Sequence, residues 1–259
     1  MKRIAVVTGA AMGNGFGIAE KLCEKGCAVM LFDMSEEVYS AEKKLTEKGY
    51  EAKAFICNIT DEENIKKCIS QTAEIYGRID ILVNNAGVAR LSEFEDTDEE
   101  MLDFHLNVNI KGTWKMTQVV VPYMRKNGWG RIIIMSSVTG SMVCDKGYSA
   151  YAVTKAGLIG LTKALAREYA EYGITVNAVC PGFILTPNVK RSAAKTCPEN
   201  PQSVIDGIAS GVPMKRLGTP EEVGSLCAFL ASEEAKYITG TSNVIDGGNL
   251  IPETNVMGV

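Results

Sequence analysis

Two residues at helical spacing could bring an acid and a base to one site, in the run Tyr151-Ala152-Val153-Thr154-Lys155. Positions i and i+4 of a helix lie on one face, so the phenol and the ammonium can share a site. A free tyrosine has a pKa of about 10, but a fixed cation beside it favours the tyrosinate and lowers that pKa. The spacing therefore predicts a tyrosine that exchanges a proton with a substrate, although the same pattern also arises by chance in helices.

A glycine-rich run, Thr8-Gly9-Ala10-Ala11-Met12-Gly13-Asn14-Gly15-Phe16-Gly17, follows a strand-like segment directly. Glycines permit a tight turn and a close approach to a pyrophosphate, and the next helix points free N–H groups at that anion. Asp33 ends the following strand-like segment, where its carboxylate can bind the ribose hydroxyls of NAD and would repel the 2′-phosphate of NADP. Met12 and Met34 occupy the places expected for a phosphate-binding cation, so the sequence predicts NAD, with NADP disfavoured.

The composition excludes several other chemistries. The formal net charge of -4 over 259 residues disfavours nucleic acid or an anionic membrane as the main partner. One histidine, His105, cannot build a multi-histidine metal centre, and we expect it to be a packed or solvent-facing residue of a helix and no metal to be bound. Eight cysteines form no C-x-x-C pair, and the N-terminal run shows no export signal. We therefore expect reduced thiols in a cytoplasmic protein.

Strand-like and helix-like segments alternate along the whole chain. This alternation, with no linker or repeat, predicts a single domain over 1–259: a doubly wound parallel sheet of seven strands with helices on both faces. The expected strands are Arg3–Thr8, Ala28–Asp33, Glu51–Cys57, Ile79–Val83, Arg131–Met135, Thr175–Val179 and Ser242–Ile245. The expected helices include Gly15–Lys25, Ser35–Lys48, Asp61–Tyr76 and Tyr151–Tyr172.

One stretch, at about 183–212, interrupts this alternation with three prolines and clustered polar residues. Long irregular segments inside a compact domain are often functional lids, so we expect a substrate lid here. The alternative is a surface insertion with short helices of its own. The apolar tail after Ile251 could either dock on the site or fray.

Four further motifs occur in a fixed order around the Tyr151–Lys155 pair. They are Asn84-Asn85-Ala86-Gly87, the run Asn107–Gly112, Ser136-Ser137, and Pro181-Gly182. With the glycine-rich turn, this set resembles the short-chain dehydrogenase/reductase family, in its compact single-domain form, from Thr8 to Gly248. The resemblance implies a Rossmann-type fold and an NAD-dependent oxidoreductase that interconverts a secondary alcohol and a ketone by hydride transfer.

The resemblance also implies a catalytic tetrad of Asn109, Ser137, Tyr151 and Lys155. Tyr151 would be the general acid or base, and Ser137 would hydrogen-bond the same substrate oxygen. Lys155 would lower the Tyr151 pKa and bind the nicotinamide ribose. Asn109 would hold a water that links Lys155 to solvent.

Carried onto this sequence, the family's cofactor contacts fall on several of the motifs above. Asn14 replaces the usual aliphatic residue between the last two glycines, and Asn58 replaces the usual aspartate facing the adenine amino group, where its amide oxygen could accept the same hydrogen bond. The implied cofactor-binding residues are Gly9, Met12, Gly13, Asn14, Gly15, Asp33, Asn58, Ile59, Asn85, Gly87, Tyr151, Lys155, Pro181, Ile184 and Thr186.

The expected substrate pocket is mostly apolar, which favours a hydrophobic ring alcohol such as a hydroxysteroid. The alternatives are a 3-oxoacyl thioester, a polyol, or a protein that binds NADH as a sensor or scaffold without turnover. The family implies a homo-oligomer, most simply a homotetramer. The pocket residues are Val138, Met142, Cys144, Tyr148 and Phe183, with Val143 and Leu185 beside them.

Overall fold

The computed structural model describes residues 2–251, and the tail from Pro252 lies outside the described residues. Seven strands form one parallel sheet in the order β3-β2-β1-β4-β5-β6-β7, which confirms the predicted doubly wound fold. The strands are β1 (Ile4–Thr8), β2 (Ala28–Asp33), β3 (Ala52–Ile56), β4 (Ile81–Asn84), β5 (Gly130–Met135), β6 (Ile174–Pro181) and β7 (Ser242–Ile245).

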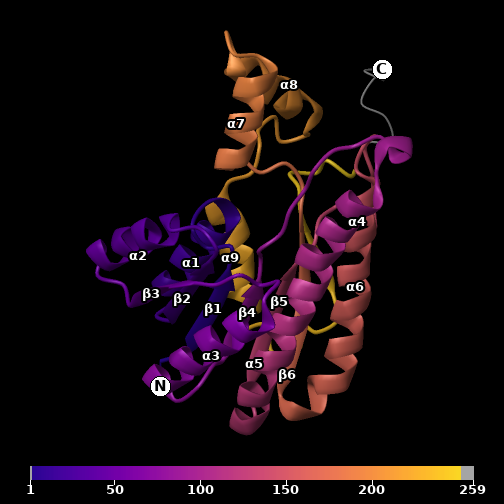
Figure 1. Cartoon of the computed structure of the whole chain (residues 1–259). Coiled ribbons are helices and arrows are strands. Elements are labelled where there is room, and N and C mark those ends of the chain that lie inside the picture. The colour runs from indigo at the N-terminus through magenta and orange to yellow at the C-terminus, as the bar shows by residue number, and fades with distance from the viewer. Residues whose placement is uncertain (1, 252–259) are drawn as a thin grey trace.

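Helices cover both faces of this sheet (Figure 1). One face carries α1 (Gly13–Glu24), α2 (Glu37–Glu47) and α9 (Pro220–Leu230). The other carries α3 (Glu62–Tyr76), α5 (Thr113–Asn127) and α6 (Ser149–Tyr169), and α4 (Glu99–His105) leads into α5 through a π-helical segment, η2 (Leu106–Gly112). Short 3₁₀ turns, η1 (Phe94–Asp96) and η3 (Ala170–Tyr172), complete this layer.

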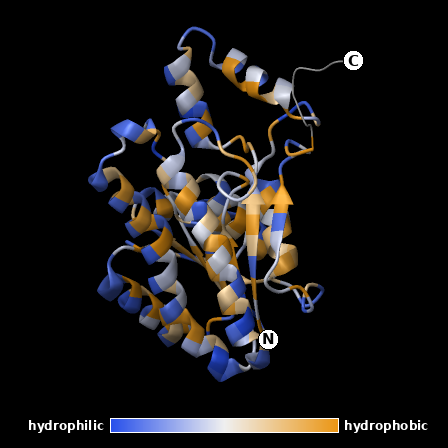
Figure 2. Ribbon diagram, turned by 90° about the vertical axis from the view of Figure 1, so that its right-hand side faces the viewer, coloured by the Kyte–Doolittle hydropathy of each residue, from blue (hydrophilic) through white to orange (hydrophobic). Residues whose placement is uncertain are grey.

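Alternate residues of the strands build two apolar cores, one under each helical layer. In β1, Val7 packs toward α1 and α9 while Val6 packs toward α3 and α5, and both side chains are fully buried. Figure 2 shows hydrophobic residues on the inner strands and hydrophilic ones mostly on outer helices and loops. Within residues 2–251, no helix combines the length and apolar character needed to cross a membrane.

Local chemistry sets the helix ends close to their predicted positions. Asp61 caps α3 by accepting hydrogen bonds from the N–H groups of Glu63 and Asn64, and Gly77 ends the helix in the left-handed region at φ 70°. Helix α1 is held by an unusually close crossing with α9. A Cβ on Gly224 would lie 2.4 Å from the Gly17 carbonyl oxygen, so only glycine permits this approach.

The irregular stretch at about 183–212 folds into two helices, α7 (Pro187–Thr196) and α8 (Pro201–Gly211), which pack on each other. Each begins with proline at its first turn, where the missing N–H costs nothing. In Figure 1 this pair stands apart from the layered body of the molecule. The helices agree with the alternative of an insertion with its own secondary structure, and the role of substrate lid stays a prediction.

Candidate active site

The glycine-rich run forms the turn between β1 and α1. Gly9 and Gly13 have φ of 64° and 56°, and a Cβ on Gly15 would lie 2.0 Å from the Gly9 carbonyl oxygen. Met12 caps α1 without any side-chain hydrogen bond, which leaves the helix N-terminus to an anion. The side-chain oxygen of Asn14 is buried here with no hydrogen-bond partner among the described residues. A tight backbone turn at an uncapped helix N-terminus fits a phosphate-bearing cofactor, because its free N–H groups can donate to phosphate oxygens.

Asp33 lies at the end of β2, beside this turn. Its two carboxylate oxygens accept hydrogen bonds from the N–H groups of Ala11 and Ser35, each at 3.0 Å. These bonds fix the carboxylate and leave it further lone pairs for ribose hydroxyls. Met34 is exposed, as the sequence suggested for a site without a phosphate-binding cation at that position.

Sequence reasoning missed one cation near the turn. Arg191 of α7 places its guanidinium Nη2 3.5 Å from the sulfur of Met12. No local pattern could reveal this contact, because 179 residues separate the two positions. Arg191 brings positive charge from the α7–α8 pair to the proposed pyrophosphate cradle.

The segment after β3 uses Asn58 differently from the prediction. Its amide oxygen accepts hydrogen bonds from the Thr60 N–H at 3.0 Å and the Thr60 hydroxyl at 2.9 Å. An amide oxygen has two lone pairs, so the atom expected to meet the adenine amino group is already engaged within the turn. Ile59, the next predicted contact, is buried against Gly112.

The Asn84–Gly87 motif locks β4 to the glycine-rich turn at the point where the strand order reverses. The Asn85 side chain donates to the carbonyls of Thr8 and Gly9 at 2.9 and 3.1 Å. The Thr8 hydroxyl accepts from the N–H groups of Asn85 and Ala86, both at 3.0 Å. Asn85 therefore shapes the turn, and ligands of open α/β sheets bind at such switch points.

The predicted acid–base group comes together at the ends of β5 and α6. The Ser137 hydroxyl hydrogen-bonds the Tyr151 phenol, and Lys155 lies on the same face of α6 with its Nζ 5.5 Å from the Tyr151 ring centroid. Ser136 instead donates to the Lys155 backbone carbonyl at 2.8 Å, so it anchors the helix. Because Ser136 contacts the helix backbone and Ser137 contacts the Tyr151 phenol, Ser137 is the better candidate for the substrate-facing serine.

Burial dominates the charge states of this group. It raises the pKa of Tyr151 above its usual value, against a smaller lowering by the Ser137 hydroxyl. It lowers the pKa of Lys155 from 10.5 to about 8. The Lys155 Nζ donates to the Met135 carbonyl at 2.7 Å. In the chain alone burial therefore raises the pKa of Tyr151, and its lowering by Lys155 together with a positive nicotinamide stays a prediction.

Asn109 lies in the π-helical segment and joins three elements. Its oxygen accepts from the Val88 N–H at 2.8 Å, and its amide group donates to the Val88 carbonyl and the Thr154 hydroxyl at 3.0 Å. A Cβ on Gly87 would lie 3.1 Å from the Asn109 oxygen and 3.6 Å from the Lys155 Nζ. The amide thus braces the loop beside Lys155, and its part in a water relay stays a prediction.

Of the predicted substrate residues, Val138 directly follows Ser137 in the chain and Tyr148 contacts Tyr151. Val138 is buried, and Tyr148 packs edge-on against Tyr151 at 5.8 Å between ring centroids. Outer positions are open: Met142 and Phe183 keep 40% and 41% of their surface exposed, and Cys144 is exposed. Val138 and Tyr148 give the pair apolar neighbours, and the role of the outer residues as a substrate pocket stays a prediction.

The predicted contacts of the nicotinamide lie at the end of β6 and in the segment after it. Pro181 is the last residue of β6, and buried Ile184 pairs with Gly218. Thr186 caps α7 by accepting from the Val189 N–H at 3.3 Å, and a Cβ on Gly13 would lie 3.5 Å from its methyl group. The predicted contact Thr186 therefore lies beside the glycine-rich turn, whereas Ile184 packs against Gly218.

His105 is a structural residue, as expected. It is fully buried, its Nε2 accepts from the Arg90 N–H at 3.0 Å, and its Nδ1 lies 2.8 Å from the Met101 carbonyl. Arg90 stacks its guanidinium 3.9 Å from the Phe104 ring centroid. Within residues 2–251 no three histidine, cysteine or acidic side chains gather as a metal site would require.

A family model described as enoyl-(acyl carrier protein) reductase matches residues 9–249 of the chain. Oxidoreductase UcpA of Escherichia coli (strain K12) is 48% identical over 257 residues, which cover 99% of this chain and 98% of that protein. The 3-oxoacyl-[acyl-carrier-protein] reductase FabG of Thermotoga maritima is 40% identical over 251 residues, covering 96% and 98% of the two chains.

An NAD-dependent glycerol dehydrogenase of Listeria innocua is 39% identical over 249 residues, covering 96% and 94%. Among solved structures, a variant of actinorhodin polyketide ketoreductase with NADPH superposes with a TM-score of 0.91 at 31% identity, covering 97% and 98%. Sequence and fold agree over nearly the full length. The chain therefore belongs to the short-chain dehydrogenase/reductase family.

Proposed function

We propose that the protein is an NAD-dependent oxidoreductase that interconverts a secondary alcohol and a ketone. The observation that carries this proposal is the hydrogen-bonded pair of Ser137 and Tyr151 with Lys155 on the same helix face. Two hydroxyl groups that already contact each other can hold one substrate oxygen between them. The oxidoreductase relatives support the same class of reaction.

The glycine-rich turn, Asp33 and the segment after β6 would hold the cofactor. When bound, a nicotinamide supplies or accepts the hydride. In ketone reduction, Ser137 orients the carbonyl oxygen and Tyr151 gives it a proton from the phenol oxygen. Burial favours this protonated phenol, because it raises the Tyr151 pKa.

Asp33 supports NAD as the cofactor, because a carboxylate fixed by two backbone N–H groups would repel a 2′-phosphate. Comparison of kcat/KM for the two cofactors tests this choice. We expect the Asp33→Ser variant to use NADPH more readily, so that its kcat/KM values for NADH and NADPH differ less than those of the wild type. A wild-type preference for NADPH would contradict the role given to Asp33.

The substrate is a ketone or secondary alcohol with an apolar body. The exposed apolar side chains of Met142 and Phe183, both predicted to meet the substrate, support this class. The hydroxysteroid expected from the sequence has no counterpart in the names of the relatives above. The two alternatives do have counterparts: a 3-oxoacyl thioester in the name of the FabG reductase, and a polyol in that of the glycerol dehydrogenase. A panel of steroid, acyl and polyol alcohols, followed by the absorbance of NADH formed, separates the three.

Tyr151→Phe tests the reaction itself. Removal of a general acid or base costs about 10²–10⁴-fold in rate, so we expect kcat to fall by that factor while NADH binding persists. Tyr169→Phe, on the same helix but away from Ser137, is the matched control and should keep full activity. Unchanged activity in Tyr151→Phe would contradict the mechanism. A wild-type protein that binds NADH but turns over no member of the panel would favour the sensor alternative.

We also infer a homotetramer in the cytoplasm. The family supports the assembly, and the free cysteines suit a reducing compartment. Light scattering that gives the mass of a monomer would contradict the assembly.

A further inference from the structure

Two cysteines lie together beside the predicted adenosine end of the cofactor site. Cys57 directly follows β3, and Cys68 lies near the middle of α3. Both side chains are buried in the same apolar core, and their thiols hydrogen-bond each other. The two sulfurs are therefore already neighbours before any chemistry takes place.

The pKa values of the two thiols are shifted in opposite directions. Burial raises the pKa of other thiols in the core, as at Cys23 and Cys227. The pKa of Cys68 is lowered instead, chiefly because the Cys57 thiol donates a hydrogen bond to it, with help from the charge of Lys67. The same bond raises the pKa of Cys57. A thiol with a stabilised thiolate beside a second thiol is the arrangement of a redox-active pair.

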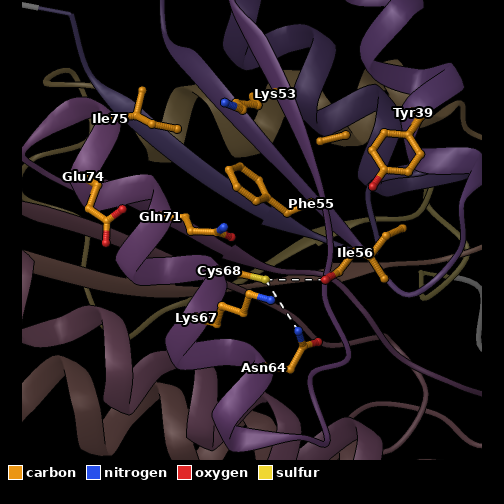
Figure 3. Close-up of a pocket in the computed structure, with 11 residues that line it drawn as sticks. Tyr39, Lys53, Phe55, Ile56, Asn64, Lys67, Cys68, Gln71, Glu74 and Ile75 are labelled. Carbon is orange, nitrogen blue, oxygen red and sulfur yellow. Dashed lines mark hydrogen bonds between the residues drawn. The ribbon is translucent and has the colours of Figure 1, made fainter.

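Cys68 is also reachable from outside. It lines a surface cavity of about 420 Å³ between α2, the edge strand β3 and α3 (Figure 3). Its sulfur lies 3.5 Å from the Ile56 carbonyl oxygen and 3.9 Å from the Asn64 Nδ2. Lys53 and Lys67 line the same cavity. A small oxidant can therefore approach this thiol without unfolding of the core.

The pair is mechanically tied to two residues predicted to hold the adenosine. Asn64 contacts the Cys68 sulfur through Nδ2, and its oxygen accepts from the Asn58 N–H at 2.7 Å. The Cys57 N–H donates to the Asp33 carbonyl at 2.8 Å. Any movement that draws the two sulfurs into a covalent bond therefore shifts the segments that carry Asn58 and Asp33.

We propose that Cys57 and Cys68 form a peroxide-sensitive dithiol, whose oxidation to a disulfide weakens cofactor binding. The second half of this proposal rests on the proposed function, whereas the first does not. Binding and oxidation are linked reciprocally, so a bound cofactor should also slow disulfide formation.

The chemistry balances with hydrogen peroxide as oxidant. The Cys68 thiolate attacks one peroxide oxygen, the O–O bond breaks, and protonation of the leaving hydroxide gives water and a sulfenic acid on Cys68. The Cys57 sulfur then attacks the Cys68 sulfur, an S–S bond forms, and its thiol proton leaves with the hydroxide as a second water. Two thiols lose two electrons in total, and one peroxide becomes two waters.

The test treats the full-length protein with hydrogen peroxide and maps peptides without reduction by mass spectrometry. We expect a Cys57–Cys68 cross-linked peptide, and an NADH dissociation constant, read by fluorescence titration, that rises at least about fivefold and returns with dithiothreitol. Cys68→Ala should keep the NADH affinity of the reduced wild type and lose the response to peroxide. Cys197→Ala, which removes a half-buried thiol outside the core, should respond like wild type.

Oxidation of Cys197 while Cys57 and Cys68 stay reduced would overturn the dithiol. A cross-link that leaves the NADH dissociation constant unchanged would overturn the coupling. Failure of the reduced protein to bind NADH would overturn the proposed function instead, and the peptide map would still report on the cysteine pair. The three failures are therefore distinguishable.

Discussion

The buried ammonium group of Lys155 should lower the free energy of unfolding of the protein. Burial lowers its pKa from 10.5 to about 8, and a difference of that size between unfolded and folded chains corresponds to roughly 3 kcal/mol near neutral pH. Lys155→Met keeps the volume, removes the buried charge and loses the hydrogen bond to the Met135 carbonyl, a loss of about 1 kcal/mol. We expect the variant to be inactive yet about 2 kcal/mol more stable at pH 7, which amounts to about 4–8 °C in Tm for a chain of this size.

The pH dependence isolates the cause. Below pH 8 both states bind the Lys155 proton and the penalty is fully present, whereas between pH 8 and 10.5 only the unfolded chain binds it. The free energy of unfolding of the wild type should therefore rise relative to that of the Lys155→Met variant as the pH rises from 8 to 10.5. Urea unfolding followed by circular dichroism at pH 7 and pH 10, at one protein concentration, measures both effects. Lys163→Met, at an exposed position of α6, is the control. A Lys155→Met variant less stable than wild type at pH 7 would refute the reasoning.

Three other substitutions have defined outcomes. Gly15→Ala places a Cβ 2.0 Å from the Gly9 carbonyl oxygen and should abolish measurable NADH binding in a fluorescence titration; affinity within twofold of wild type would contradict the cradle. His105→Leu leaves the part-buried Arg90 N–H without its acceptor and should lower the free energy of unfolding by about 1 kcal/mol in urea, a change that an exposed histidine would not cause. Arg191→Met removes the cation beside Met12 and should raise the NADH dissociation constant about fivefold with no change in Tm; an unaltered constant would separate α7 from cofactor binding.

The fold could be predicted from the sequence because each strand is an apolar run and each helix has local start or stop signals. Ala28–Asp33 and Ser242–Ile245 match their predicted bounds, and Asp61 caps α3 from the position at which the predicted helix began. Several other boundaries move by one or two residues, because backbone pairing between neighbouring strands decides where a strand ends. β6, for example, continues to Pro181 through its pairing with β7.

The site was predictable only where its members are close in sequence or belong to a motif. Tyr151 and Lys155 share a helix face at i and i+4, so their neighbourhood follows from helix geometry. The contact of Arg191 with Met12 depends on how the α7–α8 pair folds back, which no periodicity encodes. The use of the Asn58 oxygen by Thr60 is a turn preference that a family comparison of residue types does not reveal.

The same desolvation opposes the effect that we expect Lys155 to have on the pKa of Tyr151. Burial raises the pKa of Tyr151 and lowers that of Lys155, so both shifts oppose a tyrosinate–ammonium pair. The Lys155 Nζ also gives a hydrogen bond to the Met135 carbonyl, away from the phenol. Tyr151 is thus prepared as a proton donor, the form that ketone reduction needs. Alcohol oxidation needs the opposite form, which a further positive charge at the site would favour. The charge of the cofactor and the protonation state of Tyr151 are therefore coupled. Because Tyr151 and Lys155 are buried, charges near them are poorly screened and this coupling is strong.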